Sequence, residues 1–177
     1  MFLNLAGSRP VWLRSVATAS FCLAALATAY TAVVIPLVGI GLVAANVANG
    51  KGLDAALGGV AFAVLAWPFA VVLGIIPGAV IGAAGGLAIG AILAVAGKRA
   101  GPGTGAAIGL AVAVAIVTAA HLVAAEGLLD SRETSGPGRL VPYLFWLVGP
   151  GLLVIGGLTW TGYSVRRVPG GAQRAGG

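Results

Sequence analysis

The sequence predicts an all-α protein, a polytopic transmembrane helix bundle with four spans and a long, kinked second helix. Of its 177 residues, 59% are hydrophobic and only 8% are charged, whereas roughly a quarter of the residues in a soluble domain are charged. The apolar residues also stand in long uncharged runs, without the short alternating segments of a membrane barrel. Such runs indicate spanning helices, because a helix satisfies its own backbone groups in lipid.

The expected organisation is a single transmembrane helical domain over residues 15–165. A cytoplasmic segment, 1–14, precedes it and a basic cytoplasmic tail, 166–177, follows it. The spans are expected at about 15–46, 55–97, 104–125 and 141–165, according to the lengths that a bilayer requires.

Three residue patterns predict where the helices begin and end. Asn49–Gly50 suits the left-handed conformation that closes a helix at its C-terminus. Asp54 and Thr104 are expected to cap the N-termini of the second and third helices. The fourth helix carries aromatic residues near both ends, as is typical of residues at the membrane surface: Tyr143, Trp146, Trp160 and Tyr163.

The second apolar run has three interpretations, one of which is a single crossing followed by a half-helix that its neighbours protect from lipid. At about 1.5 Å per residue, residues 55–97 are too long for one straight crossing and rather short for two crossings with a loop. In the other two, the run is one tilted and kinked helix, or it is split near residues 74–77, which would give five spans.

The distribution of bases favours four spans with both termini in the cytoplasm. Four spans divide the bases seven to three, with Arg9, Arg14, Lys98, Arg99, Arg166, Arg167 and Arg174 on the richer side. Five spans would divide them six to four and would place Arg9 and Arg14 outside. The first span is then a retained signal anchor. The richness in Ala, Gly and Val is similar to that of short multispan proteins of bacteria with GC-rich genomes, which indicates a bacterial inner membrane.

Glycines at intervals of four residues form the most specific pattern. Residues four apart lie on one face of a helix, and small side chains there allow two backbones to approach closely. These helix-packing candidates are Gly78, Gly82, Gly86, Gly90, Gly101, Gly105, Gly109 and Ala113.

The short turn between the second and third helices predicts that these helices pair as an antiparallel hairpin. Gly90 is then expected to face Gly109, and Gly86 to face Ala113. Gly59 is expected to matter less, since no matching small face is evident near it.

His121 is the one histidine, and Thr118 lies three residues earlier on the same helix face. These two are the candidate polar or functional residues. No carboxylate stands at mid-membrane to act with His121 in a proton relay, so we expect an interfacial histidine bonded to a neighbouring helix or to headgroups.

No catalytic, cofactor-binding or metal-binding pattern is visible. Gly97–Lys98 lacks the preceding glycine of a phosphate-binding loop, and no serine stands in a nucleophile motif. Cys22 is the one cysteine, which excludes an intramolecular disulfide. The bases stand in pairs at the ends of apolar runs instead of in a stripe, which argues against nucleic acid as a partner.

We therefore expect a non-enzymatic integral membrane protein that acts through helix packing, as a subunit or a self-associating component. Its partners are membrane lipids, with anionic headgroups near Arg166 and Arg167, and copies of itself or a larger membrane complex. The alternative is a transporter or channel component for a small solute, since Pro36, Pro68, Pro77 and Pro150 interrupt apolar runs.

Overall fold

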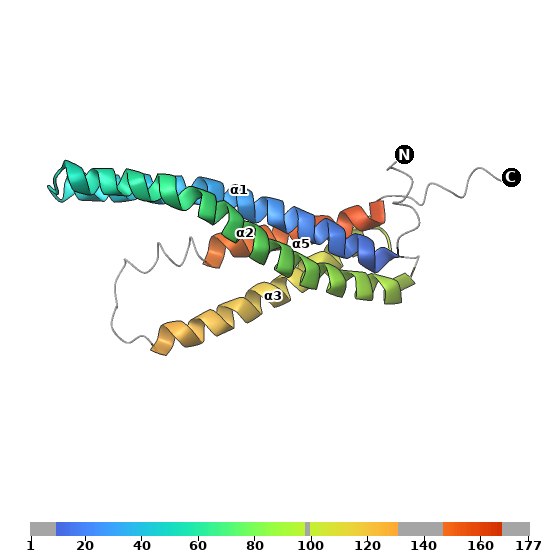
Figure 1. Ribbon diagram of the computed structural model, residues 1–177. Coiled ribbons are helices and arrows are strands. Elements are labelled where there is room, and N and C mark those ends of the chain that lie inside the picture. The colour runs from blue at the N-terminus through green and yellow to red at the C-terminus, as the bar shows by residue number, and fades with distance from the viewer. Residues whose placement is uncertain (1–9, 98–99, 131–146, 168–177) are drawn as a thin grey trace, which may run out of the picture. The chain divides into compact units, whose positions relative to one another are not determined.

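The computed structural model describes residues 10–97, 100–130 and 147–167, and the regular structure in these ranges is helical (Figure 1). Its long helices are α1 (Val11–Ala48), α2 (Leu53–Ala96), α3 (Pro102–Asp130) and α5 (Gly149–Arg167). Within these described ranges, three stretches are long and apolar enough to cross a membrane: Val11–Ala48, Gly74–Ala96 and Pro102–Ala124. The prediction of a helical protein compatible with a membrane is therefore confirmed.

α1 and α3 extend beyond the expected spans at both ends, and α2 begins before its expected start. Asp54 and Thr104 lie inside α2 and α3, so their prediction as N-caps is wrong. Pro102 begins α3 instead, a position where the missing amide hydrogen of proline costs no helical hydrogen bond. The predicted fourth helix corresponds to α5, while its expected start at 141, together with Tyr143 and Trp146, lies outside the described residues.

The turn after α1 agrees with the sequence pattern. Gly50 adopts a φ of 66°, and its amide donates to the carbonyl of Val47 at 3.0 Å. The amide of Lys51 donates to the carbonyl of Asn46 at 3.0 Å. This pair of bonds satisfies carbonyls at the helix end that have no partner within the helix. Gly97, which follows α2, also has a positive φ, of 68°.

α2 is 44 residues long and contains both Pro68 and Pro77. It continues as a helix through residues 74–77, where the sequence allowed a break. At about 1.5 Å per residue, its contour is roughly 66 Å, about twice the hydrocarbon thickness of a bilayer.

The chain forms two compact units. The first combines residues 1–23 with 79–177, and the second is residues 24–78. The second unit is a hairpin of the C-terminal part of α1 and the N-terminal part of α2, joined by Asn49–Gly52.

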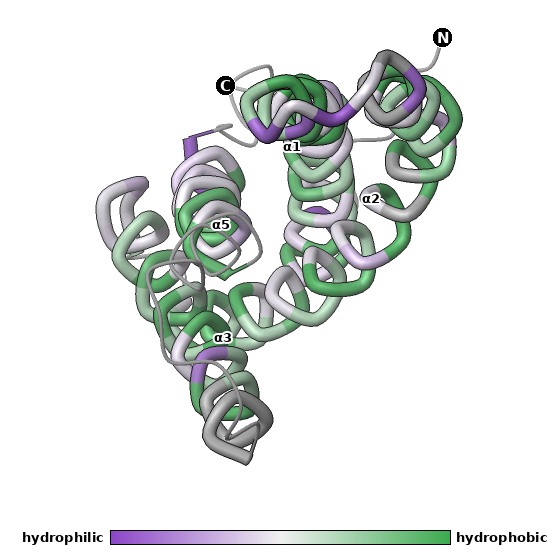
Figure 2. Tube along the Cα trace, turned by 90° about the vertical axis from the view of Figure 1, so that its left-hand side faces the viewer, coloured by the Kyte–Doolittle hydropathy of each residue, from purple (hydrophilic) through white to green (hydrophobic). Residues whose placement is uncertain are grey.

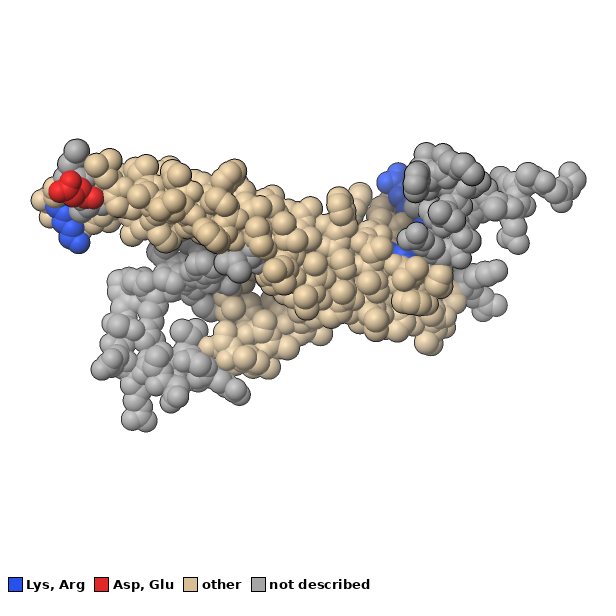
Figure 3. All heavy atoms as spheres, viewed as in Figure 1, with Lys and Arg blue, Asp and Glu red and all other residues tan. Residues whose placement is uncertain are grey.

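The helices are apolar along most of their surface. In Figure 2 the hydrophobic colour predominates along α2 and α3, while α5 also carries paler residues, and the charged side chains visible in Figure 3 lie at helix ends. Large apolar side chains such as Phe21, Val95 and Val123 are 79%, 90% and 71% exposed. In water such a surface would be unfavourable, whereas lipid chains cover it without loss.

Candidate functional site

The glycines in the C-terminal part of α2 lie against α1 within the first unit. A Cβ atom added at Gly90 would stand 2.5 Å from Cα of Trp12, and one at Gly86 would stand 2.6 Å from the carbonyl oxygen of Ser15. At Gly82 it would stand 2.5 Å from the carbonyl oxygen of Ala19. Real Cβ atoms do not approach backbone atoms this closely. The two backbones therefore cross at a separation that only glycine permits in α2.

α3 crosses α5 equally closely. A Cβ atom at Gly105 would overlap the carbonyl oxygen of Gly162, and one at Gly162 would overlap the carbonyl oxygen of Gly105. One turn along, a Cβ atom at Gly109 would overlap the carbonyl oxygen of Leu158. Ala113 continues this side of α3 and is fully buried. The sequence pattern found the close-approach positions of α3, and their partner is α5.

The expected pairing of Gly90 with Gly109, and of Gly86 with Ala113, is wrong. Gly86 and Gly90 face α1, and Gly109 faces α5. A contact that the pattern did not predict joins α2 to α5: a Cβ atom at Gly85 would stand 2.7 Å from Cδ1 of Leu158. A spacing of four residues specifies a small face, but it does not specify the helix that covers this face.

The two remaining packing candidates are Gly101 and Gly78. Gly101 precedes α3 and has open space where a Cβ atom would stand, so it is not a packing position. Gly78 lies inside α2, as the last residue of the second unit.

The hairpin of the second unit has its own close contacts, which the sequence analysis missed. A Cβ atom at Gly39 would overlap the Cβ atom of Ala63. One at Gly59 would stand 2.9 Å from Cγ2 and 3.1 Å from the amide nitrogen of Val43. The expectation that Gly59 has no matching small face is therefore wrong. Gly39 stands outside the repeats of glycine at intervals of four, so the pattern did not indicate this contact.

A hydrogen bond at Pro36 also joins the two arms of this hairpin. Proline has no amide hydrogen, so Pro36 cannot donate to the carbonyl of Ala32 one turn earlier in α1. The indole Nε1–H of Trp67, on α2, donates to this carbonyl oxygen at 3.2 Å. The side chain of one arm thus satisfies a backbone acceptor that the proline of the other arm leaves without its helical partner.

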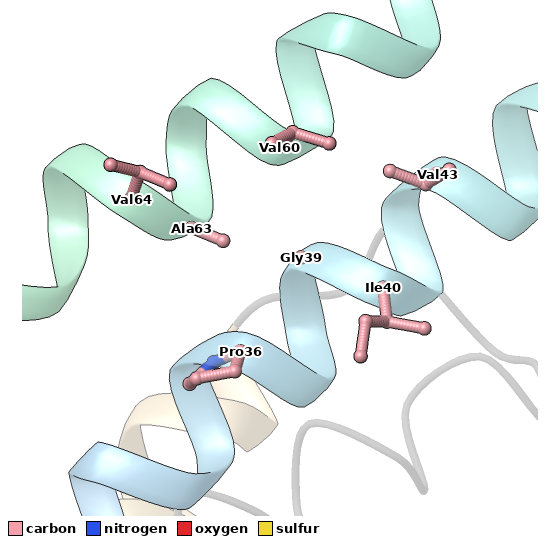
Figure 4. A pocket seen from close by; sticks show the side chains of 7 residues that line it. All are labelled: Pro36, Gly39, Ile40, Val43, Val60, Ala63 and Val64. Carbon is pink, nitrogen blue, oxygen red and sulfur yellow. The ribbon is translucent and has the colours of Figure 1, made fainter.

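The same hairpin contains an apolar groove of about 300 Å³ beside these contacts. Figure 4 shows the residues that line it, Pro36, Gly39, Ile40 and Val43 from α1 and Val60, Ala63 and Val64 from α2. The hydroxyls of Thr28 and Thr31 each donate to a carbonyl one turn earlier in α1, at 2.7 Å and 3.1 Å. The groove is thus lined by apolar residues, and these two hydroxyls are bonded within α1.

Arg166, near the end of α5, binds the end of α2. Its Nη2 donates to the carbonyl oxygens of Leu93 and Gly97, at 2.7 Å and 2.8 Å. Carbonyls in the last turn of a helix lack intrahelical donors and carry the negative end of the helix dipole, so a guanidinium is well suited to them. The sequence predicts anionic headgroups near Arg166 and Arg167; in the structure, Nη2 of Arg166 also binds these two backbone carbonyls.

Three contacts place four helix ends together in the first unit. Trp12 lies against Gly90, Gly105 lies against Gly162, and Arg166 binds the carbonyl of Gly97. α1 and α3 thus begin at the level where α2 and α5 end.

Of the polar candidates, His121 is half-buried and bonds within its own helix, and Thr118 lies one turn earlier in α3. The Nδ1–H of His121 donates to the carbonyl oxygen of Val117 at 2.7 Å, within α3. Across the helix pair, a Cβ atom at Gly151 of α5 would stand 3.8 Å from Cε1 of His121. Thr118 is exposed. Among the described residues, no three His, Cys, Asp or Glu side chains stand together as metal ligands would.

No protein-family model matches the chain, and neither does any curated protein or solved structure with which it was compared.

Proposed function

We propose that this chain is a non-enzymatic integral membrane protein that acts through helix packing, as a subunit of a larger membrane assembly or in a complex with its own copies. The proposal rests on one observation, the close approach of helix backbones at glycine. Backbones meet at glycine in α1–α2 and in α3–α5, which gives shape complementarity without polar machinery.

The groove beside Pro36 supports packing over transport. A pathway for a polar solute needs side chains that replace water around that solute. The residues lining the groove are apolar, and the hydroxyls of Thr28 and Thr31 bond to their own helix. In the broken helices of transporters, a carbonyl freed by a proline can bind the substrate. Here the corresponding carbonyl, that of Ala32, accepts a hydrogen bond from Trp67.

The proposal includes four spans in a bacterial inner membrane, with both termini in the cytoplasm. The seven-to-three division of bases supports this topology. A second observation supports this topology. α1 and α3 begin at the level where α2 and α5 end, as they would if an even number of spans returned the chain to its starting side.

Orientation is tested by thiol labelling in a chain whose Cys22 has been replaced by Ser. A cysteine at Thr134 should react with a membrane-impermeant reagent in intact cells, whereas a cysteine at Ala172 should react only after lysis. Reaction at Ala172 in intact cells would overturn the orientation.

The function is tested by purifying the tagged chain from its native membrane after crosslinking. After crosslinking within the membrane, we expect defined membrane proteins, or further copies of the chain, to copurify with the tagged chain in repeated preparations. As a control, a detergent extract of the tagged chain is mixed with a second extract, and these partners should then not copurify. A monomer without partners that conducts a small solute when reconstituted into liposomes would contradict the proposal and favour a transporter.

A further inference from the structure

The last turns of α5 present two arginines in different directions. Arg166 binds the carbonyls of Leu93 and Gly97, and its Cγ lies 3.2 Å from the position of a Cβ atom added at Gly105. Arg167, the next residue, is exposed. Successive residues of a helix point about 100° apart, so one arginine is used inside the bundle and the other is directed out of it.

Arg167 belongs to a row of large side chains in which Trp160 and Arg167 are exposed and Tyr163 is half-buried. Its Cζ lies 5.7 Å from the ring centroid of Tyr163, and that ring lies 5.8 Å from the ring of Trp160. Trp160 is 56% exposed. Residues 160, 163 and 167 are three and four apart and therefore share one face of α5.

This row has the chemistry of the membrane surface. Tryptophan and tyrosine prefer the headgroup level, where the ring meets apolar chains and the polar end meets water. A guanidinium over a ring still has its N–H groups directed outward in its own plane, where they fit a phosphate. Asp54 is the one acidic side chain that the structure describes, and it belongs to the second unit, so no described carboxylate of the first unit competes for Arg167.

We propose that Trp160, Tyr163 and Arg167 form a binding site for the phosphate of an anionic phospholipid, and that Arg166 takes no part in it. This inference rests on the proposed membrane location. The two adjacent arginines then have different roles. Arg166 holds α5 against α2, and Arg167 binds the headgroup.

The test compares Arg167→Gln with Arg166→Gln in the full chain, reconstituted into nanodiscs of phosphatidylcholine with or without phosphatidylglycerol. Native mass spectrometry measures how many phosphatidylglycerol molecules are retained, and thermal unfolding measures the stabilisation that this lipid gives. Arg167→Gln should weaken retention about five-fold, the factor expected for one base at an anionic surface, and should leave unfolding in pure phosphatidylcholine unchanged. Arg166→Gln should lower the unfolding temperature in both lipids but keep the increment due to phosphatidylglycerol.

Tyr163→Leu serves as a second variant, because it removes the ring beneath the guanidinium and keeps the charge. Its retention of phosphatidylglycerol should lie between those of the wild type and Arg167→Gln. Retention that is equal in wild type and Arg167→Gln, or lost in Arg166→Gln alone, would overturn the site while leaving the proposed function intact. A wild-type chain that does not remain in the bilayer would contradict the membrane function itself.

Discussion

Trp67 of α2 donates its indole hydrogen to the carbonyl of Ala32 of α1, at 3.2 Å. This carbonyl is the acceptor that Pro36 cannot serve, so the two helices are joined at the point where one of them lacks a hydrogen bond. In lipid no water can satisfy such a carbonyl. Trp67 therefore makes a proline tolerable in α1 and also fixes the pairing of the two arms.

A double-mutant cycle tests this relationship. Trp67→Phe should lower the free energy of unfolding through two losses, that of the packing contacts of the indole and that of its hydrogen bond. The hydrogen bond should account for about 0.6 to 1 kcal/mol of this decrease, the value typical of a hydrogen bond between membrane helices. In a Pro36→Ala background the amide of residue 36 can donate to Ala32, and this extra cost should disappear. The free energies are measured by denaturant unfolding in detergent micelles. An equal cost of Trp67→Phe in both backgrounds would show that the hydrogen bond has no role in stability.

Gly58 and Gly59 provide an internally controlled pair in the hairpin. The position of a Cβ atom at Gly58 is open, whereas at Gly59 it meets Val43 at 2.9 Å. Gly59→Leu should therefore destabilise the hairpin by about 1 to 3 kcal/mol, as in other overpacked sites, while Gly58→Leu should change stability by less than about 0.5 kcal/mol. The two variants are compared by the same unfolding assay. Equal losses would mean that the helix, and not the contact with Val43, responds to the substitution.

Removal of the Arg166 guanidinium should loosen α5 from α2. Arg166→Met keeps most of the aliphatic stem but loses both hydrogen bonds from Nη2. Bonds to charged groups contribute about 1.5 to 3 kcal/mol each when partly buried, so a loss of this order in the free energy of unfolding is expected. Arg167→Met is the matched control and should change stability in uncharged detergent by less than about 0.5 kcal/mol. A larger effect at Arg167 than at Arg166 would contradict the assigned roles.

The sequence was sufficient for the elements of the fold and insufficient for their partners. Uncharged runs predicted the long apolar helices, and Asn49–Gly50 predicted the left-handed turn, because both depend on local composition. The contacts of Gly90 and Gly109 could not be deduced, since a short turn between α2 and α3 does not force these helices to share their small faces. Ser15 and Ala19, four apart in α1, were the available signal for the partner of α2.

The remaining contacts depend on residues far apart in the chain. Arg166 and Gly97 are 69 positions apart, and their hydrogen bond follows from the arrangement of two helices that are not consecutive. Charge counting assigned Arg166 to the lipid surface because a base after an apolar run usually belongs there. The open carbonyls at the end of α2 compete for the same guanidinium, and a single sequence does not show that they lie within its reach.

The helix backbones of this bundle meet at particular glycines, and the crossing of α3 with α5 tests this most directly. The measurement is the free energy of unfolding of Gly105→Leu and Gly103→Leu in the same micelles. A side chain at Gly105 would enter the carbonyl of Gly162, whereas Gly103, two residues earlier in α3, has open space. We predict a loss of about 1 to 3 kcal/mol or more for Gly105→Leu and a change of less than about 0.5 kcal/mol for Gly103→Leu. Equal stability of the two variants would contradict the claim and would leave the glycines as a matter of composition alone.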